Sequence, residues 1–137
     1  MHYLLDTNIC IYLIKKRPLE VLDQFRQHPL QDVAISTITL FELEYGAQKS
    51  QQIKRTQKAL ARFFLPLTIL DIDRPAAADA AIIRAKLEGK GTPIGPYDLL
   101  IAGLARSRKM TLVTNNTKEF ERVDDLLLEN WVENTMG

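Results

Sequence analysis

The segment Tyr3-Leu4-Leu5-Asp6-Thr7-Asn8 contains the pattern that decides the predicted fold. A tyrosine and two leucines suit a short buried strand, Asp6 ends the apolar run, and a helical stretch follows it. The run Val33-Ala34-Ile35-Ser36 repeats this order, because a second helical stretch begins directly after it. Strands that alternate with helices indicate crossover connections and a mostly parallel sheet.

The alternation continues along the chain, and prolines and glycines mark most element boundaries. The predicted strands cover residues 3–5, 33–36, 67–72, 110–114 and, at the sheet edge, 126–132. The predicted helices cover residues 8–16, 19–27, 51–65, 75–88 and 96–108, and residues 118–120 are expected in a loop. A further helix runs to about residue 49, and residues 36–39 offer several possible caps for its start. This order predicts a single α/β domain over residues 1–137, an α/β/α sandwich with a central, mostly parallel sheet.

Composition narrows the classes of protein to which the chain can belong. The formal charge of +1 over 137 residues creates no overall field that would indicate a nucleic-acid binder. The single cysteine, Cys10, excludes an internal disulfide and suits a small buried hydrophobe between two isoleucines. The sequence contains no run of about 18 apolar residues and no basic leader before Asp6, so we expect a cytoplasmic protein without a membrane span.

Four polar residues lie near places where predicted strands end or a predicted helix begins. They are Asp6, Glu42, Asp98 and Asn116. In an open parallel sheet, ligands bind outside the carboxyl ends of the strands, so distant residues can meet there. Two carboxylates ~4 Å apart repel by roughly 4 kcal/mol at an effective dielectric of about 20, and a divalent cation reverses that sign. Oxygen donors with no cysteine and little histidine suit Mg²⁺ or Mn²⁺.

Each of these residues also has a purely structural interpretation. Asp6 is suited to cap a helix, and Asp98 lies where a carboxylate interacts well with a helix dipole. Thr39-Leu40-Phe41-Glu42 matches a capping box, and Asn115-Asn116 is typical of a turn. Glu44 lies about 200° from Glu42 around the helix, so the two cannot point to the same place.

Other chemistries find little support in the sequence. His2 and His28 are too few for a zinc site or a Ser/His/Asp triad, and no glycine-rich phosphate loop is present. Two basic clusters, at residues 15–17 and 106–109, could hold phosphates, although both also suit helix C-termini.

The segments around the four polar residues resemble a known family. They are residues 4–8, 36–46, 95–103 and 113–123, together with the late Glu129-Asn130-Trp131. In this order, and over nearly the whole chain, they are similar to the VapC family, the PIN-domain ribonuclease toxins of bacterial type II toxin–antitoxin modules.

The resemblance implies a PIN-like fold and an endoribonuclease that depends on Mg²⁺ or Mn²⁺, with tRNA as the expected substrate. It places metal-binding aspartates at Asp6 and Asp98, a further catalytic carboxylate at Glu42, and a fourth catalytic position at Asn116. That position is often aspartate in PIN domains, so Asn116 removes one negative charge. The resemblance also implies a homodimer, and a cognate antitoxin that joins it in a larger assembly and lays its C-terminal tail across the active site.

Two alternative interpretations belong to other classes. A PIN-like domain that has lost catalysis through Asn116 would only bind RNA or an antitoxin, yet such a domain has no physical need for mutually repelling carboxylates. A phospho-accepting receiver domain would have an acidic pair after the first strand and a lysine after a late strand. Here Asp6 stands alone, and Asn115 and Asn116 follow Thr114.

Overall fold

Five short parallel strands form the central sheet, in the order β3-β2-β1-β4-β5. They are β1 (Tyr3–Leu5), β2 (Val33–Ser36), β3 (Thr68–Leu70), β4 (Thr111–Val113) and β5 (Leu127–Glu129). The computed structural model describes residues 2–132, so Met1 and residues 133–137 of the predicted domain lie outside the described residues. The chain adds β2 and β3 on one side of β1 and then crosses to β4 and β5 on the other. The strand order therefore reverses beside β1, where open α/β sheets bind ligands.

The predicted helices are all present, with ends within about two residues of the expected ones. They are α1 (Thr7–Lys15), α2 (Leu19–Arg26), α3 (Thr37–Gln48), α4 (Ile53–Phe64), α5 (Arg74–Gly89) and α6 (Pro96–Ser107). The prediction of a loop at residues 118–120 was wrong, because Thr117–Phe120 forms the short helix α7, with Phe120 buried in the core. None of the helices among residues 2–132 has the length and apolar character needed to cross a membrane.

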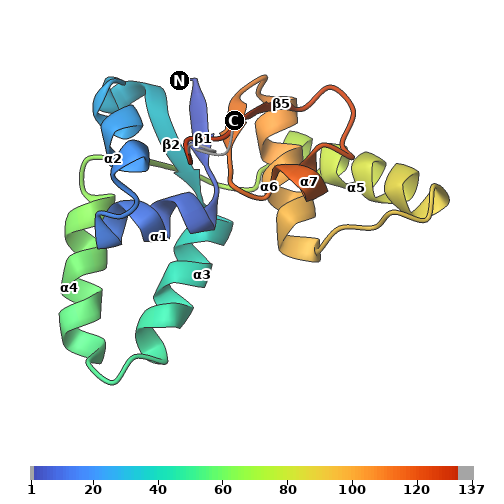
Figure 1. Cartoon of the computed structure of the whole chain (residues 1–137). Coiled ribbons are helices and arrows are strands. Elements are labelled where there is room, and N and C mark those ends of the chain that lie inside the picture. Colours follow the sequence, from blue (N-terminus) through green and yellow to red (C-terminus); the bar gives the residue numbers. More distant parts are fainter. Residues whose placement is uncertain (1, 133–137) are drawn as a thin grey trace.

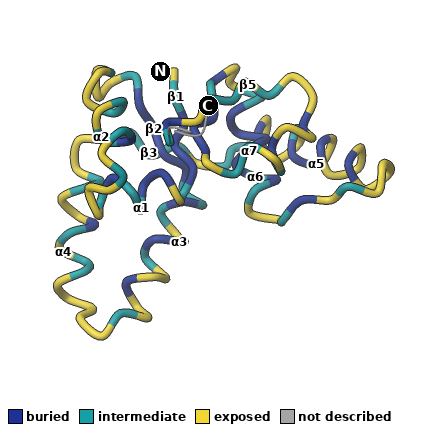
Figure 2. The backbone as a smooth tube through the Cα atoms, viewed as in Figure 1, coloured by how far each residue is buried: buried dark blue, intermediate teal, exposed yellow. Residues whose placement is uncertain are grey.

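Alternate residues of the strands face opposite sides of the sheet and build two separate cores. Leu4, Ala34 and Leu112 pack with α5 and α6, whereas Leu5 and Val113 pack with α1, α3 and α4. Figure 1 shows the same division, with α1 to α4 on one side of the strands and α5 to α7 on the other. Figure 2 shows the central strands β1 and β2 largely buried, with exposed residues on the outer faces of the helices on both sides. This arrangement confirms the predicted α/β/α sandwich.

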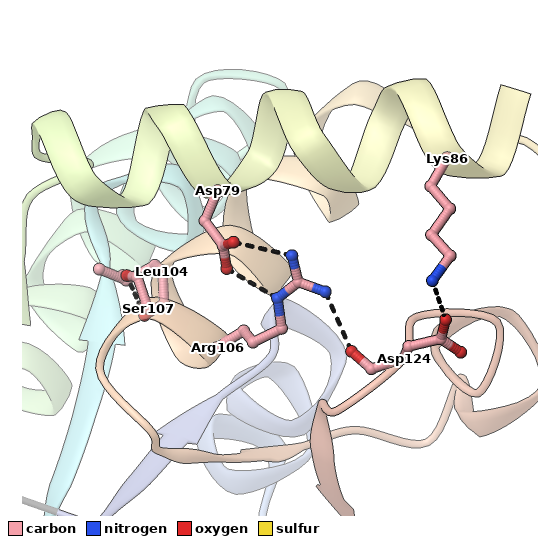
Figure 3. Close-up of polar contacts among 6 residues, drawn as sticks. All are labelled: Asp79, Lys86, Leu104, Arg106, Ser107 and Asp124. Atoms are coloured by element: carbon pink, nitrogen blue, oxygen red, sulfur yellow. Dashed lines mark hydrogen bonds and ion pairs between the residues drawn. The ribbon is translucent and has the colours of Figure 1, made fainter.

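Helices α5 and α6 pack unusually closely along the second half of α6. A Cβ atom at Gly103 would lie 2.6 Å from the carbonyl oxygen of Ala76 and 2.8 Å from Ala80 Cβ. Arg106 on α6 donates two hydrogen bonds, of 2.8 and 2.7 Å, to the carboxylate of Asp79 on α5 (Figure 3). Arg106 also donates to the carbonyl oxygen of Asp124, so one guanidinium joins both helices to the segment before β5.

Candidate functional site

Asp6 stands directly after β1, at the centre of the carboxyl edge of the sheet. Its backbone N–H donates to Val113 O at 2.9 Å and continues the pairing of β1 with β4. Its side chain is only 5% exposed, and Oδ1 accepts from the backbone N–H of Thr7 at 2.8 Å. Asp6 is therefore the N-cap of α1, as its structural interpretation predicted. The cap uses one oxygen only, because Oδ2 accepts from Thr114 Oγ1 at 2.8 Å.

Glu42 reaches the same region from α3. Thr7 Oγ1 donates to Glu42 Oε1 at 2.8 Å, so the beginning of α1 orients this carboxylate. The capping box expected at Thr39 and Glu42 does not form, because Ser36 is the N-cap and accepts from the N–H of Thr39. Thr39 already lies inside the helix, which leaves Glu42 free to face Thr7.

Asp98 lies in the first turn of α6, just after Gly95 and Pro96. Burial, followed in decreasing order by the negative charges of Asp6, Glu119 and Glu42, raises the pKa of its carboxyl from 3.8 to about 7. Asp98 accepts no hydrogen bond from any of residues 2–132, so both of its oxygens are available to a ligand. The influence of these three charges on Asp98 indicates that its carboxylate lies near theirs.

The pKa of Asp6 is also raised, with burial as the main cause. Hydrogen bonds from Thr114 and Thr7 partly oppose the shift, and the charges of Glu42 and Glu119 add to it. Three of the predicted carboxylates, Asp6, Glu42 and Asp98, thus lie together at the carboxyl end of β1 and concentrate negative charge there. We call this acidic site the crevice.

Glu119 is a fourth carboxylate of the cluster, and the sequence argument missed it. It lies on α7, where Oε1 accepts from the N–H of Gly95 at 3.2 Å and Oε2 accepts from Asn116 Nδ2 at 2.6 Å. Its spacing of three residues from Asn116 was the available signal. That spacing carries information only if residues 117–120 are helical, and they were expected in a loop.

Asn116 is the N-cap of α7 but does not use its side chain for capping. Its side-chain amide donates to Glu119, and its backbone N–H donates to Thr114 Oγ1 at 2.9 Å. Asn116 therefore contacts the cluster through Glu119 and Thr114, and the turn interpretation alone does not explain its side chain.

The basic cluster at residues 106–109 does not lie beside this crevice. Asp98 and Arg106 are at opposite ends of α6, about 12 Å apart along its axis. Arg106 pairs with Asp79, and Arg108 pairs with Asp73 at 3.1 Å. These contacts favour the structural interpretation of this cluster, in which its charges stabilise the packing of α5 and α6.

The donor set of the crevice is chemically suited to a hard divalent cation. It consists of carboxylate oxygens, and within residues 2–132 no Lys or Arg forms an ion pair with Asp6, Glu42, Asp98 or Glu119. In the same part of the chain, no three Asp, Glu, His or Cys side chains are already grouped to hold one metal ion. Mg²⁺ commonly keeps several water molecules and uses only one or two carboxylates, so it does not require a closed protein cage.

A concavity opens beside Glu42 and offers space for a larger ligand. Its volume is about 450 Å³, and it is lined by Phe41, Glu42, Tyr45 and Tyr97. The aromatic rings of Phe41 and Tyr97 meet edge to face, with centroids 5.6 Å apart.

Comparisons with known proteins agree with this architecture. The PIN domain family profile matches residues 3–126. The tRNA(fMet)-specific endonuclease VapC of Shigella flexneri is 46% identical over 131 residues, which are 96% of this chain and 98% of that protein. The chain belongs to the VapC family of PIN-domain ribonucleases. Ribonuclease VapC2 of Haemophilus influenzae strain Rd is 47% identical to this VapC-family chain and covers 96% of it, with 99% of its own length aligned.

Chains in solved VapBC structures share the fold of this chain. A chain in the crystal structure of DNA-bound VapBC from Salmonella typhimurium aligns with a TM-score of 0.91 and 44% identity. The alignment covers 96% of this chain and 99% of the Salmonella chain. Both the predicted family and the predicted fold class are confirmed. PIN-domain VapC nucleases generally depend on a divalent metal ion.

Proposed function

We propose that this chain is a metal-dependent endoribonuclease toxin that hydrolyses phosphodiester bonds in tRNA and is neutralised by a cognate antitoxin. The observation that carries the proposal is the acidic cluster at the carboxyl end of β1, formed by Asp6, Glu42, Asp98 and Glu119. The cluster occurs in a chain 46% identical to a tRNA(fMet)-specific endonuclease. An acidic crevice repels the phosphates of RNA unless a cation neutralises its charge, so we expect RNA binding at this site to require a bound metal ion.

In this proposal, Asp6 and Asp98 hold Mg²⁺, or Mn²⁺ in its place. Asp98 offers two oxygens without hydrogen-bond donors among residues 2–132, and Asp6 is fixed by Thr7 and Thr114. The bound cation would supply charge neutralisation at the scissile phosphate and a lowered pKa for the attacking water. Glu42, held by Thr7 through Oε1, accepts the proton of that water at Oε2. Asn116, the fourth residue predicted for the site together with Asp6, Glu42 and Asp98, contributes to it through its contact with Glu119.

The proposed partners follow from the relatives. The Salmonella and Rickettsia felis structures that align with this chain are VapBC complexes, both with DNA. We propose an antitoxin whose C-terminal tail covers the crevice, a homodimer of this chain, and a larger assembly of the two proteins. Cleavage of tRNA also places the proposed activity in the cytoplasm.

The test uses purified, antitoxin-free protein and total bacterial RNA, with Mg²⁺, with Mn²⁺, or with EDTA. We expect discrete fragments that require metal and disappear in the Asp6→Ala variant, with sequencing of their ends identifying the cleaved tRNA. Absence of fragments with either metal, from protein shown to be folded by circular dichroism, would favour a PIN-like domain that only binds RNA or antitoxin.

A further inference from the structure

We propose that Asn116 is a positioning residue that fixes Glu119 and Asp6, rather than a substitute for a fourth metal-binding carboxylate. The inference rests on the proposed function, because it assigns a role within the same crevice. Its basis is the pair of contacts that Asn116 makes: the side chain donates to Glu119 Oε2 at 2.6 Å, and the backbone N–H donates to Thr114 Oγ1 at 2.9 Å. Both contacts lead to carboxylates of the cluster.

The backbone contact leads to Asp6 through one hydroxyl. Thr114 Oγ1 accepts from the Asn116 N–H and therefore directs its own proton to Asp6 Oδ2, 2.8 Å away. Thr114 is fully buried, so no water competes for this proton. The turn after β4 thus holds the carboxylate that follows β1.

The side-chain contact forms one arm of a clamp around Glu119. Asn116 Nδ2 binds one carboxylate oxygen, and the Gly95 N–H binds the other at 3.2 Å. With both oxygens held, the Glu119 carboxylate has one orientation, between the beginnings of α6 and α7. Gly95 is only three residues before Asp98, so the clamp also ties the turn that carries Asp98 to α7.

The neutral amide of Asn116 completes this clamp without adding charge to the cluster. An aspartate at position 116 would set a second carboxyl group at hydrogen-bond distance from Glu119, and the two would repel unless they took up a proton to share. Asn116 also leaves its helix without a side-chain cap, although asparagine is among the best capping residues. Its amide is directed to Glu119 instead, as the positioning role requires.

A double-mutant cycle tests the inference. Asn116→Ala removes the side-chain arm, and Glu119→Ala removes the group on which it acts. We expect Asn116→Ala to lower kcat for RNA about tenfold at saturating Mn²⁺ with little change in KM, and to weaken Mn²⁺ binding measured by calorimetry. In the Glu119→Ala background, the same substitution should have no further effect on either quantity.

Two further variants serve as matched comparisons. Asn115→Ala alters the neighbouring asparagine, whose side chain contacts Tyr12 and Asn130, and should leave Mn²⁺ affinity unchanged. Gly95→Pro removes the other donor of the clamp, and its effects should parallel those of Asn116→Ala. The φ of −61° at Gly95 already suits proline, and Gly95→Ala, which retains the N–H, shows what the added carbon alone does.

The outcomes separate this inference from the proposed function. If Asn116→Ala lowers kcat or Mn²⁺ affinity equally with and without Glu119, then Asn116 acts directly on metal or RNA, and the positioning role is wrong. The role is also wrong if Asn116→Ala changes neither quantity. If the parent protein cleaves no RNA, the proposed function fails, yet the calorimetric cycle still decides whether Asn116 acts through Glu119.

Discussion

Thr7 Oγ1 donates a 2.8 Å hydrogen bond to Glu42 Oε1, so the first residue of α1 orients a carboxylate 35 positions further along the chain. Thr39 Oγ1 lies 3.1 Å from the same hydroxyl, and Ser36 Oγ donates to Thr39 Oγ1 at 3.4 Å. These hydroxyls join the ends of β1 and β2 through side chains. The crevice is therefore held by the helices that start at the sheet edge as well as by the sheet itself.

Replacing Thr7 with valine tests whether this contact matters for catalysis. The change keeps the size and β-branching of the side chain but removes the donor to Glu42. We expect kcat for RNA to fall about tenfold, which is the effect of losing one hydrogen bond to a charged group. Thr7→Ser retains the hydroxyl and should keep most of the activity. Equal losses in both variants would show that the hydrogen bond is not the cause.

The raised pKa of Asp98 predicts a pH-dependent stability of the metal-free protein. Because this pKa is about 7 in the folded state against an ordinary 3.8, the folded protein binds more protons than the unfolded chain between about pH 4 and pH 7. The stability contributed by this group therefore falls as pH rises through that window.

Asp98→Asn removes this penalty. In EDTA, the variant should be more stable than the parent at pH 8 and nearly equal to it near pH 4; because Asp98 is partly exposed, solvent screening keeps the difference well below the roughly 4 kcal/mol that the full shift would give. Urea unfolding at both pH values measures the difference. A constant difference across the window would contradict the assignment of the raised pKa to Asp98.

The close packing of α5 against α6 predicts a large effect at Gly103. Gly103→Ala would force a Cβ atom against the backbone of Ala76 and Ala80, and overpacking of this kind costs roughly 1–3 kcal/mol. Gly46→Ala in α3 is the control, because a Cβ there meets nothing within 4 Å and alanine favours the helix by about 1 kcal/mol. Thermal unfolding should move in opposite directions for the two variants, and a stabilised Gly103→Ala would refute the packing.

The Arg106–Asp79 pair should contribute more to stability than the surface pairs of α5. Both side chains are only 19% exposed, and the guanidinium binds both carboxylate oxygens. We expect a coupling energy of roughly 1–3 kcal/mol from a double-mutant cycle, and no recovery in Arg106→Lys. The exposed Arg84–Glu88 pair should give about 0.5 kcal/mol or less. Similar coupling for the two pairs would contradict this contrast.

The sheet and the ends of its strands could be predicted because apolar runs and the residues that end them are local features. Asp6 and Asp98 are fixed by such features: a carboxylate after a strand, and one behind Pro96 at a helix start. Glu42 was harder to interpret, since Thr39 offered a false cap. Only the side chain of Ser36, which binds the Thr39 N–H, shows where α3 begins.

The contribution of Glu119 could not be predicted by the same reasoning. Its place in the cluster depends on a four-residue helix and on the backbone N–H of Gly95, which is 24 residues away in sequence. A short helix has no periodic pattern to detect, and a backbone donor leaves no trace in the residue type. The position of Asn116 was predicted, but its side-chain contact became evident only with Glu119 in place.

Cleavage of purified initiator tRNA by the parent protein and by Asp98→Asn, with Mg²⁺ and with EDTA, tests the central claim most directly. The variant keeps the shape of the side chain and should not lower stability, so a loss of activity reports on the crevice. We predict one or a few discrete cuts by the parent with Mg²⁺, and none with EDTA or in the variant. Full cleavage by Asp98→Asn, or equal cleavage in EDTA, would contradict a metal-dependent active site at this cluster.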